Sequence, residues 1–98
     1  MSDEQQVTFW FVYMIRAENR ALYTGIATDV ERRFKEHLDV FYGRSNKGAK
    51  YFRGRKPLEV VYREQYVSRS EASGREYQLK KMSARAKRAL IGESISTV

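Results

Sequence analysis

A carboxylate occupies an inward position of a predicted helix. The core-facing line of the helix expected over residues 68–82 passes through Glu76 and Leu79. An ionised and unpaired carboxylate on that line is costly, so Glu76 needs either a basic partner or a bound cation. Two interpretations are therefore open. One is a salt bridge to a base at the core edge, such as Arg33 or Arg75, and the other is a metal site.

Two further side chains that could do chemistry lie one helical turn apart. Arg33 and His37 border the apolar face of a helix expected over residues 28–41, and their spacing directs both side chains toward one spot. An imidazole in this position could act as a proton shuttle. The alternatives are an arginine whose stem covers the core and a histidine that is a satisfied core residue.

Two tyrosines are expected to share one face of a β-hairpin. Its strands are expected over residues 8–16 and 21–27, with the loop centred near Glu18. That centre pairs residues whose numbers sum to 36, which places Tyr13 opposite Tyr23 and Phe11 opposite Gly25. A register shifted by one residue would separate the two phenols. Simple cross-strand aromatic packing is the alternative.

A basic stretch follows the first predicted helix. From residue 41 to residue 56 the hydrophobic period is lost and no acidic residue occurs. The stretch carries two aromatic residues, Tyr51 and Phe52, that could stack on exposed bases. It also carries six basic residues that could bind along a phosphate backbone. They are Arg44, Lys47, Lys50, Arg53, Arg55 and Lys56. The alternative is a solvated loop with buried aromatic residues.

The elements that must position these groups make an α+β domain. We predict a three-stranded, largely antiparallel sheet flanked by helices, with a third strand over residues 58–66 and a short last helix over residues 83–91. The first strand is apolar on both faces, which is typical of a central strand. Thr28 with Glu31, and Ser68 with Glu71, have capping-box spacing and predict where two helices begin. The domain is expected over residues 8–92, with a disordered tail at 1–7 and a frayed end at 93–98.

Composition narrows the class of partner. The chain has 98 residues, 42% of them hydrophobic, which suits one modest core. Its 19 basic and 12 acidic residues give a net charge of +7, which favours a polyanionic partner, nucleic acid before an anionic membrane surface. The absence of cysteine excludes disulfides and thiolate metal sites and permits a reducing compartment, so we expect a cytoplasmic protein. No apolar run is long enough to span a membrane.

In order along the chain, these residues resemble the signature of the GIY-YIG nucleases, in particular the small stand-alone bacterial members. Phe11-Val12-Tyr13 matches the first motif, Tyr23-Thr24-Gly25 matches the second, and Arg33, His37 and Glu76 follow at the family's positions. The resemblance extends from about residue 9 to residue 91. It departs from the family pattern at Phe11, which replaces a glycine, and in the absence of any asparagine after Asn46.

The resemblance implies a metal-dependent endonuclease that hydrolyses phosphodiester bonds in DNA, more than in RNA, in a repair or processing role and with structured or single-stranded substrates. Glu76 would hold Mg²⁺ or Mn²⁺, Tyr13 would take a proton from the attacking water, and Tyr23 would orient that water. Arg33 would hold the scissile phosphate, with His37 beside it. The main alternative is a DNA- or RNA-binding module of the same fold that does not cut. A third is a protein-interaction or ribosome-associated domain that uses the basic surface without any metal.

Overall fold

Three strands form one antiparallel sheet in the computed structural model, which describes residues 7–92. They are β1 (Trp10–Ala17), β2 (Leu22–Ala27) and β3 (Pro57–Tyr66), and their order in the sheet is β2-β1-β3. The predicted central position of the first strand is therefore confirmed. A strand that is apolar on both faces needs neighbours on both edges and cover on both sides, and β1 has them. The sheet leaves β2 at one edge.

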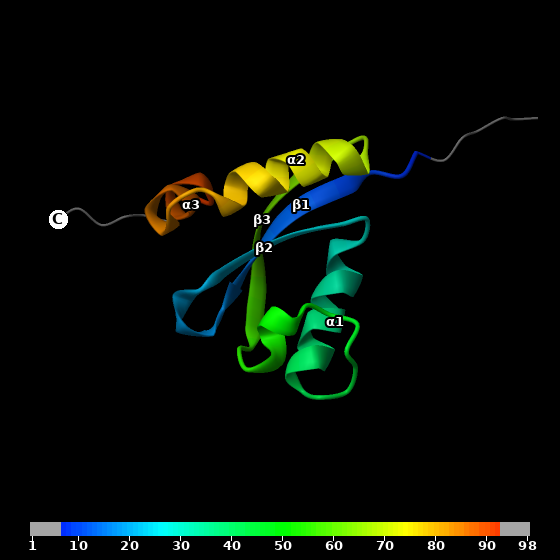
Figure 1. Cartoon of the computed structure of the whole chain (residues 1–98), viewed down its shortest axis with the longest axis vertical. Coiled ribbons are helices and arrows are strands. Elements are labelled where there is room, and N and C mark those ends of the chain that lie inside the picture. The colour runs from blue at the N-terminus through cyan, green and yellow to red at the C-terminus, as the bar shows by residue number, and fades with distance from the viewer. Residues whose placement is uncertain (1–6, 93–98) are drawn as a thin grey trace, which may run out of the picture.

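Helices cover both faces of this sheet (Figure 1). α1 (Val30–Phe41) and the short 3-10 helix η2 (Lys50–Arg53) lie on one side, and α2 (Arg69–Lys80) and α3 (Ala84–Leu90) lie on the other. A second 3-10 turn, η1 (Glu18–Arg20), closes the hairpin between β1 and β2. The predicted α+β class and helix-flanked antiparallel sheet are confirmed. The tails expected at 1–7 and 93–98 lie outside the described residues, except for Val7.

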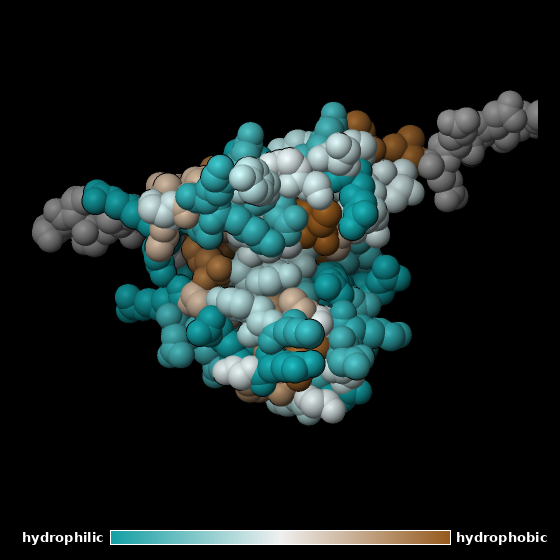
Figure 2. All heavy atoms as spheres, viewed as in Figure 1, coloured by the Kyte–Doolittle hydropathy of each residue, from teal (hydrophilic) through white to brown (hydrophobic). Residues whose placement is uncertain are grey.

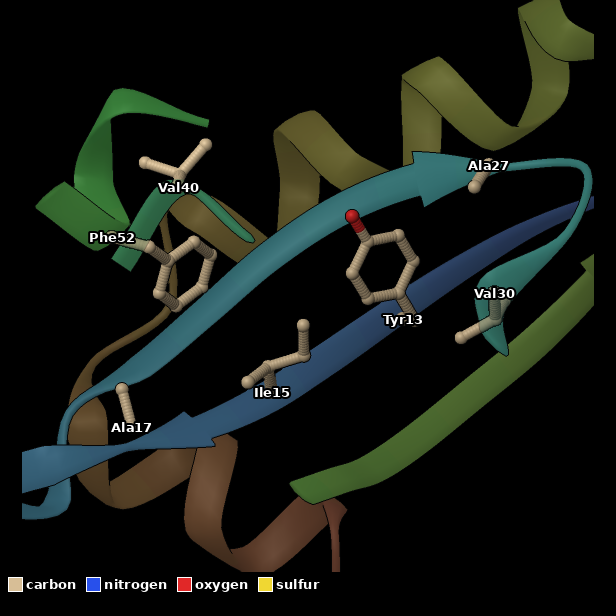
Figure 3. Close-up of a cluster of buried hydrophobic side chains, with 7 residues drawn as sticks. All are labelled: Tyr13, Ile15, Ala17, Ala27, Val30, Val40 and Phe52. Atoms are coloured by element: carbon tan, nitrogen blue, oxygen red, sulfur yellow. The ribbon is translucent and has the colours of Figure 1, made fainter. Parts of the chain in front are cut away.

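Side chains on the two faces of β1 belong to two separate apolar clusters. Tyr13, Ile15 and Ala17 point toward α1 and η2, as Figure 3 shows, and they pack there with Ala27, Val30, Val40 and Phe52. Val12 and Met14 point the opposite way and pack with Ala72 and Leu79 of α2. Strict alternation along one strand thus joins both layers of helices to the sheet.

The register of the hairpin differs from the predicted one by two residues. Tyr13 is paired with Gly25, Phe11 with Ala27, and Tyr23 with Ile15. The turn centres one residue later than predicted because Asn19 and Arg20 both adopt left-handed backbone conformations, with φ of 64° and 62°. A shift of two residues keeps every side chain on its face, so the two phenols still share one side of the sheet.

The first predicted helix begins one residue later than its capping box indicated. Asp29, not Thr28, is the N-cap, and its side chain accepts a hydrogen bond of 3.0 Å from the Arg32 amide. The buried line of α1 also differs, because it runs through Val30, His37 and Val40 while Phe34, Leu38 and Phe41 of the predicted stripe are only partly covered. Ser68 caps α2 as predicted, accepting from the Glu71 amide at 3.2 Å.

Among residues 7–92, no helix combines the length and apolar character that crossing a membrane requires.

Candidate active site

Tyr13 reaches the edge of the sheet by passing over a glycine. Its ring extends from the central strand β1 toward β2, so that its hydroxyl lies over that edge strand (Figure 3). A Cβ atom on Gly25 would lie 2.7 Å from the Tyr13 hydroxyl oxygen and 3.0 Å from Cε2 of Tyr23. Only glycine leaves this space, which is the physical reason for a Tyr-x-Gly sequence on β2. The two tyrosine rings lie side by side, with centroids 6.3 Å apart.

His37 holds the Tyr13 hydroxyl. Nδ1 of the fully buried imidazole accepts a hydrogen bond of 3.1 Å from the Ala49 amide, and Nε2 lies 2.9 Å from the Tyr13 oxygen. Because a backbone amide can only donate, the proton of the neutral ring is on Nε2, and Nε2–H donates to Tyr13. Burial, followed by the charge of Arg33, lowers the pKa of His37 to about 4. At neutral pH His37 is therefore an uncharged donor with no exposed surface for a phosphate.

A glycine also lets the loop amide reach His37. A Cβ atom on Gly48 would lie 2.5 Å from the carbonyl oxygen of Glu36 and 2.8 Å from Cα of His37. The loop therefore touches the backbone of α1 directly at this point, and the next amide, that of Ala49, is brought against the imidazole. The conformation of the loop and the tautomer of His37 are thus coupled.

The imidazole is also enclosed by aromatic rings. Phe52 is fully buried, and its ring centroid lies 4.6 Å from that of His37 and 4.9 Å from that of Tyr23. Tyr23 meets His37 edge-on at 5.3 Å. These tilted and edge-to-face contacts have the geometry that aromatic pairs prefer, and they fix the orientation of both polar rings.

Arg33 brings a positive charge to the two phenols. Its Nη1 donates to the Glu36 carboxylate and to the Lys47 carbonyl, each at 2.8 Å, which ties α1 to the basic loop. Burial raises the pKa of Tyr13, and so does the neighbouring Tyr23, while Arg33 acts in the opposite direction on both tyrosines. The Arg33 side chain is 31% exposed and so remains open to an anionic ligand.

Glu76 approaches the same edge from the other face of the sheet. It lies on α2, which packs on β2, and its negative charge raises the pKa of both Tyr13 and Tyr23. Its side chain is 21% exposed, and its carboxylate pairs with Lys80 at 3.1 Å. The expected basic partner is thus a lysine one turn along the helix. Lys80 is 54% exposed, and an exposed pair of this kind is weak and easily exchanged.

Arg75 is not the partner of Glu76, because it is held by β3. Its Nε and Nη2 bind the two oxygens of Glu64 at 2.9 Å and 3.1 Å, and the hydroxyls of Tyr62 and Tyr66 donate to the same carboxylate. Burial raises the pKa of Glu64, but these hydrogen bonds outweigh it and lower that pKa overall. The cluster fixes the rotation of α2, so that Arg75 faces β3 and the next residue, Glu76, faces β2.

The donor set restricts what metal this site could hold. Within the described residues 7–92, no three His, Cys, Asp or Glu side chains gather as metal ligands. A zinc or calcium cage built from protein ligands is therefore not formed there. Magnesium needs only one or two carboxylates and keeps waters and phosphate oxygens as its other ligands. The lone, partly exposed Glu76, whose charge acts on both Tyr13 and Tyr23, fits that requirement.

This arrangement of groups agrees with a comparison against known families. Residues 9–89 match the model of the GIY-YIG catalytic domain. The chain belongs to the GIY-YIG family.

Similar GIY-YIG chains occur in several bacteria. The UPF0213 protein DP2720 of Desulfotalea psychrophila is 47% identical over 85 residues, which cover 87% of this chain and 73% of that protein. The UPF0213 protein YhbQ of Escherichia coli K12 is 42% identical over 87 residues, covering 89% and 81%. The solution NMR structure of the UPF0213 protein BH0048 from Bacillus halodurans aligns with a TM-score of 0.51 and 40% identity, covering 85% of this chain and 82% of that one.

The predicted nucleic-acid-binding residues of this GIY-YIG chain lie in several separate places. Tyr51 lies beside Tyr23 with ring centroids 5.2 Å apart, and Arg55 lies over its ring at 4.9 Å. Arg44 and Lys56 instead gather on a more distant ring, that of Tyr42. Lys50 and Arg53 line a pocket of about 360 Å³ below the end of α1, and Lys47 contributes its carbonyl to Arg33. The expectation that Phe52 could stack on a base was wrong, because it is buried against His37.

Sequence reasoning missed two groups of positioning residues. Gly48 carries no chemical group, and nothing in its neighbours indicates that it touches a helix. The Glu64 cluster left a clearer signal, because Tyr62, Glu64 and Tyr66 alternate on one face of β3. A carboxylate between two phenols on one strand face indicates a polar network that needs a cation.

Proposed function

We propose that this chain is a metal-dependent endonuclease that hydrolyses phosphodiester bonds in DNA, with Mg²⁺ or Mn²⁺ held at Glu76. The convergence of groups at the β2 edge supports this proposal most directly. Two phenols from β1 and β2, a guanidinium from α1 and a carboxylate from α2 interact there, although they are far apart in the sequence. Acid–base, phosphate-binding and metal-binding groups are thus combined at one place.

Tyr13 is the group we assign to proton removal from the attacking water. Its oxygen accepts a hydrogen bond from His37 Nε2–H, and this donor stabilises a phenolate once it forms. Arg33 favours the same ionisation through its charge. A divalent cation on Glu76 would reverse the unfavourable effect of that carboxylate on both phenols and would polarise a phosphate oxygen. His37 is in this scheme a positioning residue.

Arg33 is the residue we assign to the scissile phosphate, since a planar guanidinium can hold two phosphate oxygens and stabilise the charge that grows on them. Tyr23, beside Tyr13 and partly exposed, would orient the water. Gly25 leaves the space in which both phenols meet. Tyr51, next to Tyr23, would contact the base beside the cleaved bond.

The decisive experiment is cleavage of labelled duplex, flap and single-stranded DNA, with magnesium and with a chelator. We expect cleavage only with the metal, and we expect Glu76→Ala and Arg33→Ala to lose turnover by at least about 100-fold. Glu71→Ala is the matched control, because Glu71 is an exposed carboxylate on the same helix. Cleavage that persists in chelator or in Glu76→Ala would overturn the proposal. Binding of DNA without any cleavage would instead establish a binding module.

A further inference from the structure

A second group of basic side chains lies at the hairpin end of the molecule, apart from the basic stretch 44–56. It comprises Arg20 on η1, Lys81 after α2, and three residues of α3, and we name it the α3 surface: Arg20, Lys81, Arg85, Lys87 and Arg88. α3 and the β1–β2 hairpin lie together at one end of the molecule in Figure 1. Three of these cations, on Arg20, Lys87 and Arg88, line one pocket of about 150 Å³.

In the part of the chain that the structure describes, no salt bridge joins these five side chains to an acid. No acidic residue occurs from position 77 to position 92. Glu18, the acid nearest to Arg20 in the sequence, is turned toward β3, where its Oε1 accepts from the Lys56 amide at 2.8 Å. Within residues 7–92, no ion pair is formed by Arg85 or Lys87. Arg88 donates to the Arg20 carbonyl at 2.8 Å, and Lys81 lies over the Tyr77 ring at 4.5 Å, contacts that hold these two side chains without neutralising their charge.

The positive charge of the chain is concentrated in two places. The stretch 44–56 and the α3 surface hold eleven of the 19 basic residues, and the rest of the chain has eight basic residues against 12 acidic ones. The remainder of the molecule is therefore negatively charged. A polyanion is attracted to these two surfaces and not to the protein as a whole.

The α3 surface adjoins the candidate active site along the edge strand. Leu22 lines the pocket between the hairpin and α3, and Tyr23 follows it on β2. Lys80, which precedes the α3 surface, lowers the pKa of Tyr23 through its charge. The stretch 44–56 meets Tyr23 from the other side, through Tyr51. Figure 2 shows mostly hydrophilic residues along the top of this face, over α2, with paler and hydrophobic residues across its middle.

We propose that the α3 surface binds the phosphate backbone of the nucleic acid some nucleotides away from the phosphate that Arg33 holds. A strand bound along the β2 edge would then contact cations on both sides of the site. This inference rests on the proposed function only in requiring that nucleic acid binds, not that it is cut. A membrane is the less suitable partner, because among residues 7–92 the large exposed apolar side chains belong to other parts of the chain than α3 and the hairpin.

The test is DNA binding measured in chelator, where cleavage does not interfere. Fluorescence anisotropy with a labelled duplex and with single-stranded DNA would be followed across a range of NaCl concentrations. The variant Arg85→Gln with Lys87→Gln removes two charges from the α3 surface. The matched control, Lys35→Gln with Arg69→Gln, removes two exposed charges from α1 and the start of α2. Thermal unfolding checks that all variants are folded.

We expect the α3 variant to bind about tenfold more weakly at ~0.1 M salt, with the slope of log K against log salt shallower by about 1 to 2 on duplex DNA. The control variant should change affinity by no more than about twofold. Equal effects of the two variants would overturn the inference. The inference would also be overturned if the α3 variant bound DNA as the unmodified protein does but lost binding to phosphatidylserine vesicles. If the unmodified protein bound no DNA, both proposals would fail, whereas binding without cleavage would overturn only the proposed endonuclease activity.

Discussion

The substitution Gly25→Ala tests whether the candidate site needs the space that glycine leaves for the Tyr13 hydroxyl. The new Cβ would lie 2.7 Å from the Tyr13 hydroxyl oxygen, where ordinary contact begins at 3.4 Å, so that oxygen must move by about 0.7 Å. The Tyr13 oxygen is also the atom that His37 holds at 2.9 Å. A displacement of about 1 Å in a catalytic group can cost about 100-fold in rate, so we expect the cleavage rate constant to fall by roughly 10- to 100-fold.

Stability should change far less than activity in this variant. Replacing a strand glycine by alanine favours the folded backbone by about 0.5–1 kcal/mol, and crowding Tyr13 opposes that gain by about 1–3 kcal/mol. The protein should therefore remain folded. Single-turnover cleavage with enzyme in excess measures the rate constant of the chemical step, and circular dichroism follows unfolding.

The matched control is Gly74→Ala. Gly74 lies on α2 two residues before Glu76, and a Cβ added there meets no atom within 4 Å. We expect full activity and about 1 kcal/mol of added stability, because alanine is the better helix former. A folded Gly25→Ala variant that cleaves at the rate of the unmodified protein would refute the role given to the Tyr13 position.

Two further predictions concern the lone histidine. In Gly48→Ala the added Cβ would lie 2.5 Å from a backbone atom of α1, so the loop must withdraw from His37. We expect the free energy of unfolding to fall by about 1–3 kcal/mol and the nitrogen-15 NMR signal of His37 Nδ1 to change. Neither change should appear in the control Gly54→Ala, where an added Cβ meets nothing within 4 Å. The second prediction follows from the pKa of His37, about 4 in the folded protein against an ordinary value of 6.5. The unfolded chain takes up the proton first as pH falls through this window, so the contribution of His37 to stability, present above pH ~6.5, should decrease by about 3 kcal/mol by pH ~4. Urea unfolding of the unmodified protein and of His37→Gln at several pH values measures this contribution. If the difference in stability between the unmodified protein and the variant did not shrink at low pH, His37 would not be held neutral.

The sequence alone determined the layers of this fold and the order of its chemical groups. The period of the apolar residues in β1 decided that it is central, because alternating side chains on both faces require cover on both sides. The Ser68 cap decided where α2 begins. The ordered tyrosines, arginine, histidine and glutamate indicated the family, which the match over residues 9–89 confirmed.

Only the tertiary structure decided how these groups meet. Left-handed residues at the hairpin turn set the register that places Tyr13 over Gly25. Asparagine adopts this conformation readily but arginine rarely does, so the conformation of Arg20 depends on the packed hairpin. The tautomer of His37 depends on an amide twelve residues later, brought into place by a glycine that touches α1. Glu76 pairs with Lys80, whereas Glu64 of β3 holds Arg75. Contacts between distant segments have no period or spacing in the sequence, so they follow only from the folded chain.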